Sequence, residues 1–422
     1  MVLPFTFTPM PHIYFGRGSI QKIGDISAKF GGSVLLITGG GSLKRTGKFD
    51  VITKVIGQKK IEYVHTSVSG EPSPGLVDET VLEFKDKRID AVLAVGGGSV
   101  MDFGKAVSAM LILGGREGVS VVEFLEGIGN RSHDGSKLHF IAVPTTSGTG
   151  SEATKNAVLS EIGGNGFKKS IRHDNFVPDA AVIDPELMLS CPPDVTAACG
   201  MDALTQLLES YFSTKASPMT DALAMSGIEA VGKSLIPAAI ESPDDLDARE
   251  GMAYGALVSG ITLANAGLGL VHGVASFVGG FFDIPHGVVC ANLMGPAMKE
   301  TLEALNRDGR DGAVDEEVRR RALKKFAVAG AALDGKRISK ENAKENAKEN
   351  AKENAKENET DYFSRLLVDR IYELVELLKI PRFGEYGITE GDVEKIASVA
   401  ENKNNPVSLS KDVIARVIRE RL

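Results

Sequence analysis

The sequence predicts a two-domain α/β protein, with a parallel, doubly wound sheet in its N-terminal half and only helices in its C-terminal half. Short apolar runs recur in the first half, and the polar stretches between them are long enough to form crossover helices. After Pro193, helical periodicity replaces this alternation. The chain has 422 residues, which is more than a single hydrophobic core usually serves.

Four apolar runs are predicted as buried strands that end in turn residues: SVLLIT (33–38), AVLAVGGGS (91–99), HFIAVPTT (139–146) and DAAVIDP (179–185). Two stretches rich in Ala, Leu and Glu are predicted as helices, at 196–213 and 216–240. The sequence pattern changes from short apolar runs to helical periodicity at about 185–195. This change divides the chain into an α/β domain over residues 1–190 and a helical domain over residues 191–422.

Composition and charge narrow the class of protein. The net charge is −8, and the basic runs Arg319–Arg321 and Lys324–Lys325 are short, so no nucleic-acid partner is expected. No apolar run is long enough to span a membrane, and the N-terminus lacks the pattern of a signal peptide. The three cysteines form neither a disulfide framework nor a CxxC metal clip. We therefore expect a cytoplasmic protein with no membrane partner.

Residues 340–358 repeat the letters KENA. An α-helix has 3.6 residues per turn, so a residue that recurs every four positions shifts steadily around the helix. The Ala residues of this repeat therefore form no fixed apolar face. The segment is interpreted as a surface insertion at about 339–359, and a partner-binding arm is the alternative.

Glycine-rich turns follow two of the predicted strands. Gly96–Ser99 lie between a strand and a helix, where bare backbone N–H groups attract phosphate, although a plain tight turn has the same pattern. Gly39–Ser42, the first of these two glycine turns along the chain, is followed by Lys44 and Arg45. No acidic residue stands there to bind a ribose 2′-OH, and the two cations suit a 2′-phosphate, which slightly favours NADP over NAD. The polar stretch 144–152 is expected to line the same crevice.

A second group of polar residues lies in the helical half. Asp202 and Gln206 are four residues apart and share one helix face. His272 and His286 both have glycine neighbours and lie 14 residues apart. A lone His in such a context is more often a packed residue, but two of them together with Asp202 favour a divalent metal site, for Fe(II) or Zn(II).

These motifs occur together and in order in one known family. The chain resembles the iron-containing (group III) alcohol dehydrogenases over nearly its whole length. The resemblance rests on EPSPG (71–75), GGGSVMDFGK (96–105), PTTSGTGSE (144–152), DAAVIDPEL (179–187), GMDALTQLLESY (200–211), HGVASFVGG (272–280) and PHG (285–287).

The resemblance implies the architecture shared with dehydroquinate synthase, in which an NAD(P)-binding α/β domain and a helical metal-binding domain enclose a cleft. It also implies oxidation of alcohols, or reduction of aldehydes, with NAD(P) and Fe(II) or Zn(II). Members are generally homodimers or larger assemblies. The implied partner is therefore a small alcohol or aldehyde substrate.

The resemblance also assigns residues. The metal ligands fall on Asp202, Gln206, His272 and His286, with Gln206 in place of a ligand His; Ser276 stands where many relatives carry a proton-relaying His. The implied cofactor contacts are Gly39, Gly40, Gly41, Ser42, Gly97, Gly98, Ser99, Asp102, Thr145, Thr146, Ser147, Thr149, Ser151 and Lys168. The first turn, GGGSLKRTG, is similar to that of the NADP-using aldehyde reductases.

The expected chemistry is hydride transfer between the nicotinamide and a substrate whose oxygen is polarised by the metal. Asp202, His272 and His286 supply the minimum of three protein ligands, and Gln206 would add a carbonyl oxygen or a hydrogen bond to bound water. Proton release would use water, Ser276 or the cofactor ribose. Two alternatives stay open: an oxidoreductase for a polyol, hydroxy acid or maleylacetate-type substrate, and a nucleotide-binding pseudoenzyme. Two interpretations stay open for five apolar residues: they line an apolar pocket, or they occupy ordinary core positions. These residues are Phe124, Leu125, Tyr254, Leu257 and Leu263.

Overall fold

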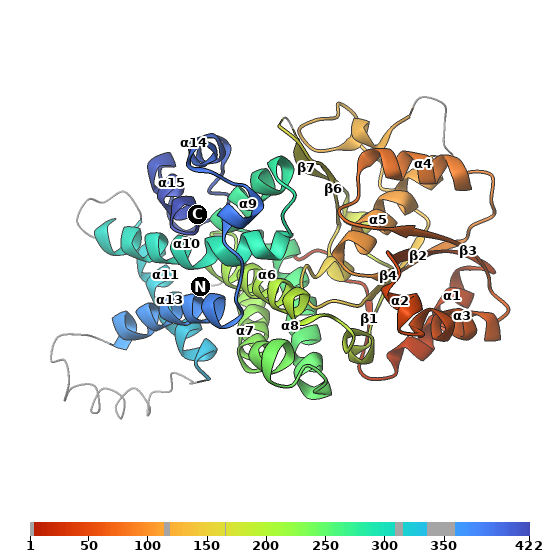
Figure 1. Ribbon diagram of the computed structural model, residues 1–422, viewed down its shortest axis with the longest axis horizontal. Coiled ribbons are helices and arrows are strands. Elements are labelled where there is room, and N and C mark those ends of the chain that lie inside the picture. Colours follow the sequence, from red (N-terminus) through yellow and green to blue (C-terminus); the bar gives the residue numbers. More distant parts are fainter. Residues whose placement is uncertain (1–3, 114–118, 165, 309–314, 336–358) are drawn as a thin grey trace.

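The computed structural model describes residues 4–113, 119–164, 166–308, 315–335 and 359–422 (Figure 1). The α/β half and the helical half lie side by side (Figure 1). The KENA repeat at 340–358 lies outside the described residues, so its interpretation as a surface insertion stays a prediction.

The N-terminal half contains the predicted parallel sheet. Its six strands pair in parallel in the order β1-β8-β5-β4-β2-β3. The strands are β1 (His12–Phe15), β2 (Ser33–Gly39), β3 (Glu62–Val68), β4 (Ala91–Gly96), β5 (His139–Pro144) and β8 (Ala180–Ile183). The four predicted runs are confirmed as β2, β4, β5 and β8, although 98–99 at the end of the second run belong to the following helix. The edge strands β1 and β3 were not predicted because they are partly exposed and lack a continuous apolar run.

Helices cover both faces of the sheet (Figure 1). Alternate residues of the central strands point to opposite faces, so Leu36 and Leu93 share a core with one set of helices, whereas Leu35 and Val92 share a core with the other. The first set is α1 (Ile23–Phe30) and α3 (Lys48–Gln58), and the second is α4 (Pro74–Phe84) and α5 (Gly98–Ile112). The fold is therefore doubly wound, as predicted.

The strand register brings the glycine turns together. Thr38 pairs with Val95, and Gly96 pairs with Pro144, so β2, β4 and β5 end at the same edge of the sheet. From β2 the chain moves outward to β3, whereas from β4 it moves the opposite way to β5. The switch point of the sheet lies between β2 and β4, which is where open α/β sheets bind nucleotides.

Two further features lie at this edge. The short helix α2 (Ser42–Arg45) follows the first glycine turn. An antiparallel hairpin of β6 (Asn156–Glu161) and β7 (Phe167–Arg172) stands apart from the main sheet, and β7 packs against helix α9 (Leu270–Phe281) of the helical half. The hairpin thereby forms a wall that joins the two halves.

The described part of the C-terminal half contains helices and no strand, as predicted. Helix α6 (Pro193–Phe212) is buried on nearly all sides and packs against α7 (Pro218–Ile236), α8 (Leu246–Ala266) and α10 (His286–Asp308). An α-helix that is apolar around most of its circumference belongs at the centre of a bundle. The other helices are α11 (Glu316–Leu333), α13 (Glu359–Leu377), α14 (Glu390–Val399) and α15 (Lys411–Arg419).

Helix α7, with the short π-helix that follows it, is long and apolar enough to cross a membrane, since Pro218–Glu241 contains an 18-residue window with a mean hydropathy of 1.3. In the structure it packs against α6 and α8, and a Cβ added at Gly227 would lie 2.5 Å from Leu207. Such contacts are those of a core helix. Helices α8 and α9 pass the same test only as a pair and are bent by 102° from one another.

The backbones of the two halves approach one another closely at a pair of glycines. Gly150, in the loop after β5, has φ +60°, and a Cβ added there would lie 2.5 Å from Cα of Gly260 on α8. A Cβ added at Gly260 would in turn lie 2.8 Å from the carbonyl carbon of Gly150. Both contacts involve backbone atoms, which cannot move aside as a flexible side chain can.

We therefore expect Gly260→Ala to lower the free energy of unfolding by about 1–3 kcal/mol, the usual cost of overpacking, and to weaken binding of the expected NAD(P)H cofactor by shifting the loop. Urea unfolding and a fluorescence titration with NADPH measure both effects. Gly57→Ala is the matched control, because nothing lies within 4 Å of the added methyl group in helix α3. Equal stability and equal NADPH affinity of Gly260→Ala and the wild type would contradict this account of the contact.

Candidate active site

Residues of both halves line a cleft of about 690 Å³. The cleft contains most of the residues that the sequence singled out: Gly97, Gly98, Ser99, Asp102, Thr146, Thr149, Ser151, Lys168, Asp202, Gln206, His272, Ser276 and His286. The candidates that do not line it are Gly39, Gly40, Gly41, Ser42, Thr145 and Ser147. Of the apolar candidates, Leu263 lines the cleft, whereas Phe124, Leu125, Tyr254 and Leu257 do not.

The second glycine turn forms a cradle at the N-terminus of α5. A Cβ at Gly98 would lie 2.6 Å from Thr149, and one at Gly97 would lie 3.3 Å from Thr146. The helix has no side-chain cap at this end. Its first N–H groups therefore face the cleft without a capping side chain, an arrangement that fits a phosphate group.

The hydroxyl-rich loop after β5 is tied to the same helix. Ser151 Oγ donates a hydrogen bond of 2.6 Å to Asp102 Oδ1. The Lys105 ammonium group lies 3.7 Å from the same oxygen and donates to the carbonyl oxygen of Ser151 at 2.8 Å. Burial raises the pKa of Asp102 and lowers the pKa of Lys105 to about 8. The pair thus anchors the loop over the cradle, and Lys105 is the last residue of the GGGSVMDFGK motif (96–105).

Two loop candidates turn away from the cleft. The backbone N–H of Thr145 donates to Gly96 O at 2.9 Å, and Ser147 Oγ donates to Met188 Sδ at 3.0 Å. Both residues therefore contribute to the shape of the loop rather than to its surface in the cleft.

The first glycine turn lies beside the cradle, at the carboxyl end of β2. Gly41 has φ +116°, a conformation that glycine adopts without strain, and its N–H donates to Gly39 O at 2.7 Å. Arg45 folds back toward this turn, because its guanidinium lies 3.4 Å from the position of a Cβ on Gly41. Lys44 lies over the Phe49 ring at 5.2 Å. The turn therefore carries two cations just outside the residues that line the cleft.

Lys168, on strand β7, is the predicted cation on the cofactor side. Its ammonium group pairs with Glu71 Oε2 at 3.0 Å. Its aliphatic chain runs along α9, since Lys168 Cδ lies 3.3 Å from the position of a Cβ on Gly279. Glu71 belongs to the EPSPG motif after β3, so this motif orients a charge in the wall of the cleft.

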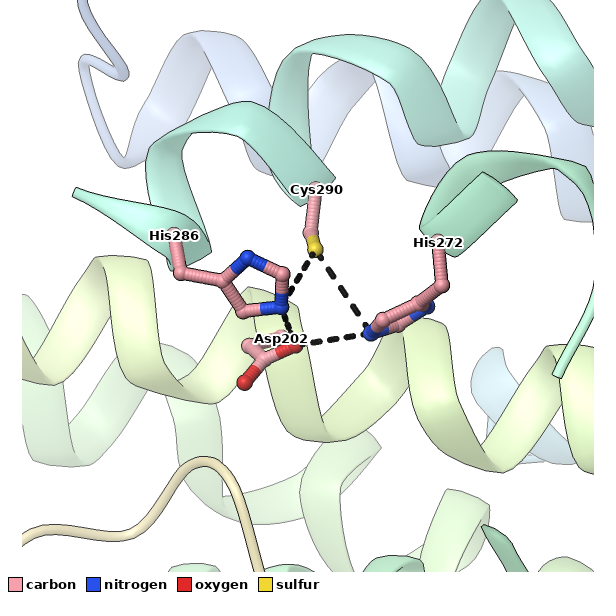
Figure 2. A group of neighbouring side chains, drawn as sticks. All are labelled: Asp202, His272, His286 and Cys290. Carbon is pink, nitrogen blue, oxygen red and sulfur yellow. Dashed lines mark hydrogen bonds and ion pairs between the residues drawn. The ribbon is translucent and has the colours of Figure 1, made fainter. Parts of the chain in front are cut away.

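Three predicted ligands converge at the floor of the cleft. Asp202 comes from α6, His272 from α9, and His286 is the first residue of α10 (Figure 2). Asp202 Oδ1 lies 3.3 Å from His272 Nε2 and 3.8 Å from His286 Nε2. This oxygen is buried and makes no hydrogen bond. A buried, unpartnered carboxylate oxygen beside two imidazoles fits a bound cation.

Glu209, seven residues after Asp202 on the same face of α6, orients one of these imidazoles. Its Oε2 lies 2.7 Å from His272 Nδ1, and its Oε1 accepts a hydrogen bond of 2.6 Å from the N–H of Val271. Because Nδ1 carries the proton that Glu209 accepts, Nε2 presents its lone pair to the site. Glu209 is 2% exposed, so its charge is held in the core beside the site.

Gln206 and Ser276 both hydrogen-bond to residues of the donor group. Gln206 Nε2 donates to Asp202 Oδ2 at 3.1 Å, and its Oε1 accepts from Ser259 Oγ at 2.8 Å. Ser276 Oγ donates to the carbonyl oxygen of His272 at 2.8 Å, within its own helix. This geometry favours Gln206 as a hydrogen-bonding partner of the carboxylate and leaves the relay role of Ser276 a prediction.

Charges in the site shift several protonation equilibria. Burial alone would lower the pKa of His272, but Cys290, Asp202 and Glu209 together raise it well above its ordinary value. Burial lowers the pKa of His286. Burial would raise the pKa of Asp202, but His286 and His272 hold it below its ordinary value. The carboxylate therefore stays ionised and available to a cation.

The structure adds three residues that the sequence analysis missed. Cys290 lies one helical turn after His286 and completes a group of four potential ligands with Asp202 and the two histidines (Figure 2). Glu209 lies seven residues after Asp202 on the same helix face. Both spacings are visible in the sequence. Lys403 lines the cleft and donates to the carbonyl oxygen of His272 at 3.0 Å, and no motif marks it.

A phosphate cradle at the switch point of a parallel sheet and a buried set of metal donors open onto the same cleft. Together they define a dinucleotide-dependent oxidoreductase with a metal centre. Residues 10–185 match the family model described as iron-containing alcohol dehydrogenase. Residues 196–422 match the C-terminal model of the Fe-containing alcohol dehydrogenase family. The chain therefore belongs to the iron-containing alcohol dehydrogenase family.

Individual relatives agree with this assignment. Long-chain-alcohol dehydrogenase 1 of Geobacillus thermodenitrificans is 36% identical over 287 residues, which cover 68% of this chain and 70% of the relative. The NAD-dependent methanol dehydrogenase of Bacillus methanolicus is 33% identical over 279 residues, which cover 66% of this chain and 71% of the relative. The crystal structure of a 1,3-propanediol oxidoreductase superposes with a TM-score of 0.82 at 27% identity and covers 100% of both chains.

The contact between Glu209 and His272 generates a prediction. We expect Glu209→Gln to weaken binding of a divalent cation by about 10–100-fold, the usual effect of removing a carboxylate that orients a ligand histidine. Competition with a chromophoric chelator measures the dissociation constant. Glu250→Gln on α8 is the control, because the Glu250 carboxylate pairs with Arg17 at the surface. An unchanged metal affinity in folded Glu209→Gln would show that Glu209 does not support the site.

Proposed function

We propose that this protein interconverts a small alcohol and its aldehyde, using NADP(H) and a divalent cation, Fe(II) or Zn(II), held by Asp202, His272 and His286. The observation that carries the proposal is the buried, unpartnered Asp202 Oδ1, which faces two imidazoles in the cleft that also contains the glycine cradle. The cradle and the donor set are the two parts that a nicotinamide-linked alcohol dehydrogenase needs within reach of one another.

The α/β half binds and orients the cofactor in this proposal. The N-terminus of α5 at Gly97–Ser99 binds the phosphates, and the loop at Thr146–Ser151, anchored by Asp102, covers them. Lys168, held by Glu71, places a positive charge on the nicotinamide side. Gly39–Ser42, with Lys44 and Arg45, holds the ribose and its 2′-phosphate.

The helical half positions the substrate oxygen. When bound, the cation supplies Lewis acidity that favours the alkoxide over the alcohol, or that polarises the aldehyde carbonyl. Asp202 keeps its charge in the buried site, and Glu209 fixes the ring of His272. The His286 side chain is 21% exposed and that of His272 is 6% exposed, so substrate approaches from the side of His286. The apolar Leu263, in the same wall, excludes water from the reacting atoms.

The assembly of the protein belongs to the same proposal. The family resemblance predicts a homodimer or a larger homo-oligomer, and the sequence predicts a cytoplasmic location. Both stay predictions.

The first experiment tests activity and metal dependence together. We expect chelator-treated protein to lose NADPH oxidation with butanal and to regain it on anaerobic addition of Fe(II) or Zn(II), measured by loss of NADPH absorbance. Asp202→Asn should lower kcat at least about 100-fold, because a Lewis acid contributes several kcal/mol to the transition state. Asp25→Asn, at the surface of α1, is the control for loss of a carboxylate.

No turnover with either metal, despite measurable NADPH binding, would reject the butanal reaction. In that case a polyol, hydroxy acid or maleylacetate-type substrate, tested in the same assay, would distinguish a different enzyme from a nucleotide-binding pseudoenzyme.

The second experiment tests the choice of cofactor. We expect Lys44→Ala with Arg45→Ala to raise KM for NADPH by about tenfold to a hundredfold and to leave KM for NADH unchanged, because only NADPH carries the 2′-phosphate. Lys54→Ala, on the exposed side of α3, is the control. A wild type that prefers NADH, with a double variant that alters neither KM, would assign the enzyme to NAD, the cofactor named for the Bacillus methanolicus relative.

A further inference from the structure

Cys290 places a sulfur atom against the three proposed metal ligands. The residue is fully buried on α10, one turn after His286. Its Sγ lies 3.7 Å from His272 Nε2 and 3.7 Å from His286 Nε2. With Asp202 Oδ1, the four donor atoms all lie within 4.8 Å of one another, and Figure 2 shows the four side chains converging from three helices.

The separations match the size of a four-coordinate metal site. Zinc binds nitrogen and oxygen at about 2.0–2.2 Å and sulfur at about 2.3 Å, so two ligand atoms of a tetrahedral site lie about 3.3–3.6 Å apart. Asp202 Oδ1 lies 3.3 and 3.8 Å from the two imidazole nitrogens, and Cys290 Sγ lies 3.7 Å from each. Four of the six separations between the donor atoms are therefore close to those between ligands of one ion, and all six are within 4.8 Å.

Hydrogen bonding does not account for the group when both imidazoles are neutral, which is the state that binds a metal. Glu209 takes the Nδ1 proton of His272, so Nε2 of this ring presents a lone pair 3.3 Å from Asp202 Oδ1. Both atoms are acceptors, and Asp202 Oδ1 has no hydrogen-bond partner. The single proton of the Cys290 thiol cannot serve this oxygen and two imidazole nitrogens together. A cation among the four atoms satisfies all of them.

Gln206 leaves Asp202 Oδ1 available to a cation. Its amide nitrogen faces Asp202 Oδ2 and its carbonyl oxygen accepts from Ser259, so the amide holds one carboxylate oxygen and leaves Oδ1 for the metal. Cys290 does not line the cleft, whereas Asp202, His272 and His286 do. The sulfur would therefore lie on the side of the ion away from the cleft, and substrate would bind from the cleft as a fifth ligand, a coordination number that catalytic zinc can reach.

We propose that Cys290 is the fourth protein ligand of the catalytic metal, so that the donor set is one carboxylate oxygen, two imidazole nitrogens and one thiolate sulfur. Thiolate ligation suits Zn(II) better than Fe(II) bound by harder donors. The inference rests on the proposed function in one respect, namely that the site binds a divalent cation. It goes further in assigning the ligand that Gln206 does not supply.

The experiment uses full-length protein that has been stripped of metal and titrated anaerobically with Co(II), a spectroscopic substitute for Zn(II). Wild type should bind one Co(II) and show the ultraviolet charge-transfer band of a thiolate–Co(II) bond. Cys290→Ser should lose the band and bind Co(II) at least about tenfold more weakly. Its preference for Zn(II) over Fe(II), from competition titrations, should also fall. Cys191→Ser should behave as wild type, since Cys191 lies outside the cleft and the donor group.

The outcomes separate the inference from the function on which it rests. Stoichiometric Co(II) binding by the wild type without a thiolate band would overturn the role of Cys290 and leave the proposed function intact. Failure of the wild type to bind Co(II), Zn(II) or Fe(II) would overturn both. The wild-type spectrum decides the question even where Cys290→Ser does not fold, because Cys191→Ser and Cys199→Ser identify the sulfur by keeping the band.

Discussion

The site depends on how closely the two halves of the chain approach one another. The backbone of Gly150, in the loop that covers the cofactor cradle, packs directly on the backbone of Gly260 in α8, with no side chain between them. The same loop is tied to α5 through Ser151 and Asp102, and α8 packs against α6, which carries Asp202. This backbone contact, together with the packing of β7 on α9, thus sets the distance between the two functional parts. Hydride transfer tolerates little error in that distance. Glycine at positions 150 and 260 fits this requirement, because any side chain there would push the two backbones apart.

Buried charge is arranged in connected pairs along this path. Lys105 neutralises Asp102 below the cofactor loop, Lys168 pairs with Glu71 in the wall, and the histidines face Asp202 and Glu209 at the floor. Each of these charged groups has an oppositely charged partner, and, among the residues that the structure describes, the buried atoms at the floor of the cleft that make no hydrogen bond are Asp202 Oδ1 and His286 Nδ1. A buried carboxylate oxygen without a hydrogen bond, beside two imidazoles, indicates where a ligand belongs.

Much of this arrangement could be predicted from the sequence, and the remainder could not for identifiable reasons. The central strands were visible as apolar runs because both of their faces are buried, whereas β1 and β3 lie at the edges, are partly exposed and have no such run. The parallel order brings Gly39, Gly96 and Pro144 to one edge, as the turn residues indicated. Helix spacing relates Asp202 to Gln206 within one element. Only tertiary packing, or resemblance to a family, can relate either of them to His272 and His286 on other helices.

Gln206 and Cys290 show what the spacing of residues along a helix can and cannot predict about a site. Both lie four residues after a proposed ligand on a helix, so each shares a face with it. From the sequence, Gln206 was expected to add a carbonyl oxygen or a hydrogen bond to bound water, and the three cysteines were expected to form neither a disulfide framework nor a CxxC metal clip. In the structure the roles differ, since Gln206 is bonded to Asp202 and Ser259, while the Cys290 sulfur faces both imidazoles. A chain that carries Gln where the family resemblance places a ligand His therefore retains four donor atoms around one point. The fourth comes from the neighbouring helix, and it changes the chemistry of the site from nitrogen to sulfur.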